Sequence, residues 1–242
     1  FFVQHDIDIT NWLGLSYGIR YVDYRYLGPR STFNYDPLFP QSSETVISEN
    51  QFADNELIQN YNAWEPRVSL RISLSEQASL KFGYNRMNQF IHLMSNTATI
   101  APTDVWKLSD QNIKPQSATQ YSAGLFYNFL DNTIETSIEG YYKTLDNVLE
   151  YKDGARLILN PYIESELLSG IGEAYGIEVF LKKKSKPMTG WISYTYSRSL
   201  RQVIGAYPTE TINQGLVYPS NFDKPHNLTL VYEYKFNNLL KY

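Results

Sequence analysis

The alternation of apolar and polar residues is the feature that most constrains how this chain folds, and it is clearest over residues 67–74. There the even-numbered residues are valine, leucine or isoleucine, and the odd-numbered residues are arginine or serine. Because successive side chains of a strand point to opposite faces, this pattern predicts a strand with one apolar and one polar face. The alternation resumes after residues 75–77, which predicts a hairpin with a tight turn.

The same hairpin recurs along the chain, and about nine strands are predicted, many of roughly 10 to 14 residues. Four very short connections alternate with four long segments: the former lie near residues 11, 76, 131 and 186, and the latter at about 28–64, 90–118, 145–172 and 202–224. Tight turns at one rim and long loops at the other are typical of outer-membrane barrels, whereas a soluble sandwich has no reason to sort its loops by length. The predicted fold class is therefore all-β, an antiparallel transmembrane β-barrel.

Composition agrees with strands of which only one face is apolar. The mean hydropathy is −0.39, and no run approaches the roughly 18 apolar residues of a membrane helix. Aromatic residues nevertheless make up 15% of the chain, as in barrels whose strands alternate between lipid and water. The aromatic residues near the predicted turns, expected at the membrane interface, are Trp12, Phe129, Trp191 and Phe236.

Residue types exclude several functional classes. The chain has no cysteine, which excludes disulfides, a thiolate nucleophile and Cys-ligated metal sites. A net charge of −4 gives no electrostatic reason to expect a nucleic-acid partner. The three histidines share no ligand spacing, and Asp6 and Asp8 lie on the opposite strand face from His5. No metal and no cofactor are predicted.

Residues 14–18 (GLSYG) match the Gly-x-Ser-x-Gly pattern of a nucleophile elbow. That motif requires a strained turn from a strand into a helix. Ser16 instead lies within an alternating strand pattern with no helical pattern after it. Ser16 is therefore predicted to be a wall residue, and no catalytic residue is predicted.

The polar strand faces carry charges of both signs. Such a mixed wall predicts a hydrated interior, or one filled by a polar plug, and argues against a strongly ion-selective pore. The residues predicted to face the lumen are Arg20, Arg67, Arg71, Lys81, Asn85, Glu135, Glu139, Glu178, Lys182 and Glu233.

The long segments are predicted to be ordered surface loops with aromatic side chains that either stack on a ligand or pack the loops together. The candidate ligand contacts are Tyr35, Phe39, Trp64, Trp106 and Tyr207. A short helix is predicted at about 160–170, with Asn160 as its cap, Pro161 in the first turn and Gly170 at its end.

Several segments resemble the barrels of TonB-dependent outer-membrane receptors, especially those of Bacteroidetes-type bacteria. They are WEPRVSLR at 64–71, KFGYNR at 81–86, IKPQ at 113–116, EGYYK at 139–143, AYGIE at 174–178 and YPSNFDKPHNL at 218–228. The last resembles the loop-to-strand entry found late in these receptors. The resemblance covers nearly the whole chain, but each motif is short and structural, so it identifies the barrel and not its ligand.

The resemblance implies a barrel of about 22 strands, plugged by an N-terminal domain and opened by an inner-membrane energy-transducing complex. Residues 1–242 show no plug, energy-coupling box or signal peptide, and residues 237–240 read as another short turn. We therefore expect this chain to be a section of the C-terminal half of a receptor barrel in the outer membrane of a Gram-negative bacterium. Its expected partners are outer-membrane lipids and the TonB–ExbB–ExbD complex through the missing N-terminal part, and a surface lipoprotein is an additional candidate.

The expected function is import of a scarce, bulky substrate, and the sequence leaves open whether this is an iron chelate, a cofactor such as a cobalamin, a glycan or a peptide. Three alternatives stay open. A passive porin-like barrel would be encoded with only 8 to 18 strands and no plug. An outer-membrane hydrolase would use Ser16, and a soluble carbohydrate-binding sandwich would purify without detergent.

Overall fold

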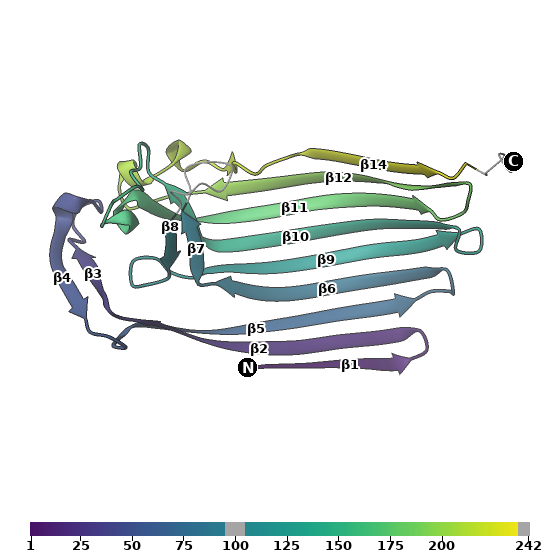
Figure 1. The fold of residues 1–242 in the computed structure, drawn as a ribbon, viewed down its shortest axis with the longest axis horizontal. Coiled ribbons are helices and arrows are strands. Elements are labelled where there is room, and N and C mark those ends of the chain that lie inside the picture. Colours follow the sequence, from purple (N-terminus) through teal and green to yellow (C-terminus); the bar gives the residue numbers. More distant parts are fainter. Residues whose placement is uncertain (95–104, 237–242) are drawn as a thin grey trace, which may run out of the picture.

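The computed structural model describes residues 1–94 and 105–236. Nine long antiparallel strands lie side by side in one open sheet, with β1 at one edge and β14 at the other (Figure 1). Their bounds are β1 Phe2–Thr10, β2 Leu13–Leu27, β5 Leu57–Ser73, β6 Ala78–Gln89, β9 Gln116–Phe129, β10 Ile134–Tyr151, β11 Leu167–Lys183, β12 Met188–Gln202 and β14 His226–Tyr234. A two-residue strand, β13 (Tyr218–Pro219), pairs with the C-terminal part of β12. The prediction of about nine strands in an all-β antiparallel sheet is confirmed.

The connections are sorted by length to the two ends of the sheet, as predicted (Figure 1). The tight turns fall at residues 11–12, 74–77, 130–133 and 184–187. In the third of these, Leu130, Asp131 and Asn132 all have positive φ, between 48° and 64°. Aspartate and asparagine tolerate this left-handed conformation better than most residues, which explains why the sequence turns there.

The long connections contain two small hairpins and several single turns of 3-10 helix. The hairpins are β3 (Arg30–Tyr35) with β4 (Val46–Phe52) and β7 (Ile91–Met94) with β8 (Val105–Leu108). The 3-10 turns are η1 Ser43–Thr45, η2 Ile163–Glu166, η3 Pro208–Glu210 and η4 Asn213–Gly215. None of the helices in the described ranges is long and apolar enough to cross a membrane.

The strands run further into the long connections than the sequence predicted. β5 begins at Leu57 and not near residue 64, β10 continues to Tyr151, and β11 begins at Leu167. Polar residues on both faces hide the alternation there, while the backbone ladder continues regardless of side chain. The helix predicted at 160–170 is wrong for the same reason, since only η2 forms and the residues that follow it pair with β10.

The strand register collects the apolar residues on one face of the sheet. Neighbouring strands place Tyr17, Val68, Tyr84, Tyr121, Tyr142 and Tyr175 in one continuous row. On β9 the apolar face ends at Phe129. About 25 Å of strand separates Phe129 from Tyr121, which is close to the height of an outer-membrane apolar band. This face is open: Leu125 is 42% exposed and Leu230 is 70% exposed. An exposed apolar band of this extent is suited to lipid, not to water.

Trp191 departs from the predicted interfacial ring. Its partner in β11 is Lys182, so it lies on the polar face, with its ring centroid 5.9 Å from that of Phe180. Period two decides this placement, because Trp191 is an odd residue in a strand whose even residues are apolar. Nearness to a turn was therefore a poor guide to its face.

The largest buried apolar cluster is formed by residues of the long connections together with Leu167, the first residue of β11. It comprises Met94, Ile113, Leu157, Ile163 and Leu167. We call residues 28–56, 90–94, 105–115, 152–166 and 203–225 the loop layer. Residues 237–240, predicted as a further turn, lie outside the described ranges.

Candidate functional site

The polar face of the sheet is the first candidate site. The register places all ten residues predicted to line a lumen on the face opposite the apolar rows. Arg71 lies opposite Lys81, Glu139 lies opposite Glu178, and Lys81 and Glu139 both lie opposite Gly124. A pair of cations and a pair of carboxylates therefore face each other across one glycine.

Three of the ten residues form ion pairs on this face. Arg71 Nη2 lies 3.1 Å from Asp8 Oδ1, and Lys184 pairs with Glu135. Arg20 Nη2 lies 2.6 Å from Glu65 Oε2, and the side chain of Glu65 is 2% exposed. Glu65 was missed in the sequence, where it stands between Trp64 and Pro66 without any pattern that marks a buried carboxylate.

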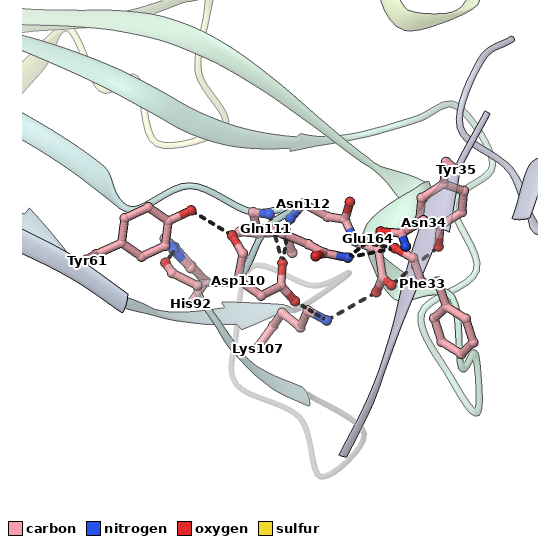
Figure 2. A network of polar contacts seen from close by, with 12 residues as sticks. Phe33, Asn34, Tyr35, Tyr61, His92, Lys107, Asp110, Gln111, Asn112 and Glu164 are labelled. Atoms are coloured by element: carbon pink, nitrogen blue, oxygen red, sulfur yellow. Dashed lines mark hydrogen bonds and ion pairs between the residues drawn. The ribbon is translucent and has the colours of Figure 1, made fainter. Parts of the chain in front are cut away.

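The loop layer is the second candidate site, and a buried cation organises it (Figure 2). Lys107 on β8 lies 3.0 Å from Asp110 Oδ2 and 3.1 Å from Glu164 Oε2. Both carboxylate side chains are 3% exposed, and Lys107 is 18% exposed. We call Lys107, Asp110 and Glu164 the buried triad. Because Glu164 belongs to η2, the triad joins two connections that are distant in sequence.

Asp110 also stabilises a local turn of the backbone. Its Oδ1 accepts hydrogen bonds from the backbone N–H groups of Asn112 and Ile113, both at 2.9 Å. This is the local turn that aspartate favours. The backbone carbonyl of Asp110 accepts a 2.8 Å hydrogen bond from the hydroxyl of Tyr61 on β5 (Figure 2). The turn is thereby fixed to the barrel wall.

The first long connection is attached to the triad by polar side chains. Gln111 Nε2 and Asn112 Nδ2 donate to the carbonyl of Phe33 at 3.1 and 3.0 Å. The hydroxyl of Tyr35 donates to Glu164 Oε1 at 3.3 Å (Figure 2). Burial, followed by the charge of Glu164, raises the pKa of Tyr35 well above its usual range, so this tyrosine remains a hydrogen-bond donor. Three connections thus share one network.

Electrostatics in this network favour a charged lysine and a neutral histidine. Burial lowers the pKa of Lys107, but the charges of Asp110 and Glu164 and their hydrogen bonds raise it by more, and the net pKa is raised. His92 is 4% exposed, and its Nε2 lies 3.1 Å from Ser109 Oγ. Burial lowers the pKa of His92 despite the opposing charge of Asp110. His92 is therefore neutral at physiological pH.

The predicted loop aromatics do not form one cluster. Tyr35 is attached to the triad, and the hydroxyl of Tyr207 donates to the carbonyl of Pro37 at 3.4 Å. Phe39 and Trp106 are 56% and 66% exposed. The placement of Trp64 in a loop was wrong, because it lies in β5 on the apolar face, with its ring centroid 4.7 Å from that of Tyr21.

The Gly-x-Ser-x-Gly motif lies in a regular strand. Ser16 lies within β2 opposite Ser69 and accepts a hydrogen bond from Gln4 at 3.4 Å. Within the described ranges, no group of three or more metal-ligating side chains is present.

Comparison with known proteins agrees with this architecture. A family model described as "TonB dependent receptor-like, beta-barrel" matches residues 1–241. No curated protein sequence matches the chain. Similar solved structures include the ferric-catecholate import receptor Fiu of E. coli K12, with a TM-score of 0.61 and 14% identity over 98% of this chain and 32% of that one.

Two further solved structures are similar to the same degree. The alcaligin outer-membrane receptor FauA of Bordetella pertussis has a TM-score of 0.59 at 14% identity over 99% of this chain and 34% of its own. The FrpB iron transporter of Neisseria meningitidis has a TM-score of 0.59 at 14% identity over 98% of this chain and 30% of its own. At these identities the likeness is one of fold, and the chain spans about a third of the length of each protein.

Proposed function

The chain belongs to the TonB-dependent receptor β-barrel family, and from this premise we propose that it forms part of the wall of a receptor that imports a scarce, bulky substrate with energy from the TonB complex. The family is one of outer-membrane receptors of Gram-negative bacteria and not of enzymes, which removes the hydrolase alternative for Ser16. The family match over residues 1–241 carries the proposal. The exposed apolar band and the long connections at one rim support it.

We propose that the rest of the receptor lies outside these residues. In this proposal a plug domain fills the lumen, further strands close the barrel, and the TonB–ExbB–ExbD complex acts through the plug. The mixed charges of the polar face support a wall in contact with polar protein or water, since neither sign dominates it. A surface lipoprotein that covers the loop layer is a further partner of this proposal.

An iron chelate is the substrate class to test first. Several of the similar solved structures are named for iron or iron chelates, among them FrpB, Fiu and the ferripyoverdine receptor of Pseudomonas aeruginosa. In this chain Phe39 and Trp106 offer exposed rings from the loop layer. Exposed aromatic side chains on a rigid support are suited to stacking on planar ligand groups.

Uptake measurements test the transport proposal. Cells that express the complete receptor are given radiolabelled ferric chelates, with and without a functional TonB. We expect uptake that stops when TonB is deleted. Uptake that continues unchanged without TonB would instead support a passive porin-like barrel.

Two tryptophans give a matched test of the loop contacts. Trp106→Ala removes a ring that is 66% exposed in the loop layer, and Trp64→Ala removes one that is 58% exposed on the outer face of β5, away from the lumen. We expect about a 10-fold loss of substrate affinity for the first and no change for the second. An unchanged affinity in Trp106→Ala would show that this ring does not contact the substrate, and equal losses in both variants would point to a general effect on the fold.

A further inference from the structure

The pairing between β5 and β6 ends before the two strands reach the loop layer. The last residue pair between these strands is Arg67 opposite Asn85. Beyond this pair β5 remains bonded to β2 as far as Leu57, and β6 remains bonded to β9 as far as Gln89. The two halves of the sheet therefore separate above Arg67 and Asn85.

A hollow of about 450 Å³ lies at the base of this division. Two arginines on the polar face of the sheet line it, Arg20 from β2 and Arg67 from β5. Arg86 of β6 also borders the space, but its partner on β9 is Thr119, so its side chain belongs to the opposite face. Glu65 is the one carboxylate among its lining residues. We call this space the arginine hollow.

The carboxylate of Glu65 is fully engaged. Its Oε2 accepts a 2.7 Å hydrogen bond from Arg20 Nε. Its Oε1 accepts bonds from Asn88, at 2.7 Å from the backbone N–H and at 3.3 Å from the side-chain amide. Arg20 and Glu65 thus neutralise each other.

Arg67 is exposed, and it makes no ion pair with any residue in the two described stretches of chain. The arginine hollow therefore carries an excess of one positive charge, that of Arg67. Guanidinium groups bind carboxylates and phosphates through parallel hydrogen bonds. A hollow attracts an anion more strongly than a flat surface does, because the surrounding protein focuses the electrostatic field.

Hydroxyl-recognising groups line the same space. Ser16 and Ser69 contribute hydroxyls. The side-chain Oδ1 of Asn85 is buried and receives no hydrogen bond within residues 1–94 and 105–236. A buried carbonyl oxygen without a donor costs free energy, which a ligand hydroxyl would recover.

We propose that the arginine hollow binds an anionic, hydroxyl-bearing ligand of the acidic-sugar class, with Arg67 on its acid group and Asn85 accepting from a hydroxyl. The inference rests on the proposed receptor function only in treating this ligand as part of the imported substrate. In this proposal the arginine hollow binds the acid group and a hydroxyl of the ligand, whereas the exposed aromatic rings of the loop layer stack on planar groups.

The test uses the complete receptor in detergent and measures binding of glucuronate and of glucose by calorimetry. Glucose keeps the hydroxyls and lacks the carboxylate. We expect glucuronate to bind and glucose to bind at least about 10-fold more weakly, because a charge-assisted contact contributes at least this factor. Arg67→Gln weakens glucuronate by about 10-fold or more. Arg25→Gln, on the same strand as Arg20 but on the opposite face, leaves binding unchanged.

Succinate separates the hydroxyl contact from the charge contact. Asn85→Ala weakens glucuronate by about 5-fold and leaves succinate, which has no hydroxyl, unaffected. Glucuronate binding that is unaltered in Arg67→Gln, or equal binding of glucose, overturns the proposal. TonB-dependent uptake of the ferric chelates is measured in parallel, so that failure of the arginine hollow is distinguished from failure of the receptor function.

Discussion

Replacing Lys107 with methionine is expected to open the loop layer while the barrel wall stays intact. Lys107 Nζ lies 3.0 Å from Asp110 and 3.1 Å from Glu164. At an effective dielectric constant of about 20, each contact at this distance has a Coulomb energy of about 5 kcal/mol, most of which is offset by desolvation. Without the cation, two carboxylates that are each 3% exposed remain side by side. Such a loss costs about 3 to 5 kcal/mol, and we expect the lower end because Lys107 is partly exposed.

Hydrogen exchange of the complete receptor measures this effect. A destabilisation of about 3 kcal/mol raises local opening by about 100-fold, so peptides from 28–56, 105–115 and 152–166 should exchange faster by that factor. Peptides from β9 serve as the internal reference. Lys114→Met is the matched control, because Lys114 is an exposed lysine of the same connection.

A double variant makes the reasoning refutable. Lys107→Met combined with Glu164→Gln removes one of the two stranded carboxylates, so its loops should exchange more slowly than those of Lys107→Met alone. If the single variant exchanges like the unaltered protein, the buried triad does not hold the loop layer together. If the double variant exchanges faster than the single one, hydrogen bonding to Glu164 outweighs the charge effect worked out above.

The remaining predictions concern pH, the loop core and the lipid face. The pKa of His92 is lowered in the folded state, so the loop layer should lose stability as pH falls below about 6.5, and His92→Asn should abolish this loss in exchange corrected for intrinsic rates. Ile163→Ala, at a core residue that is 6% exposed, should destabilise the loop layer by about 2 to 4 kcal/mol in the same exchange experiment. Leu125→Arg, midway down the lipid face of β9, should lower barrel stability by about 2 to 4 kcal/mol in a gel-shift unfolding assay, whereas Thr119→Arg, above the tyrosine row, should cost less than about 1 kcal/mol.

The sequence predicted the sheet well because period two encodes it locally. An alternating segment such as residues 67–74 determines which side chains share a face, and the turn residues near 131 determine where the chain reverses. The strand ends were predicted poorly. Beyond the membrane both faces of a strand contact water or loops, so β10 continues to Tyr151 through residues that no longer alternate.

The buried triad could not be predicted from the sequence. Lys107 and Glu164 are 57 residues apart, and each stands in a segment that reads as an ordinary polar loop. Only the fold, by returning every long connection to the same rim, brings them within hydrogen-bonding distance. Trp106 was recognised as a candidate because aromatic residues are conspicuous in loops, but the neighbouring lysine that supports it was not.

The position of the core explains why a receptor of this kind needs the triad. Lipid covers the apolar face of the sheet, so the strands need no second layer of protein. The long connections stand in water, where ordering each residue costs about 1 to 2 kcal/mol of backbone entropy. The buried apolar cluster around Ile113 and Ile163 and the buried triad help to offset that cost. A loop that is ordered before its ligand arrives loses less entropy on binding. The same contacts that hold residues 28–56, 105–115 and 152–166 together therefore also increase the affinity that exposed rings such as Trp106 can provide.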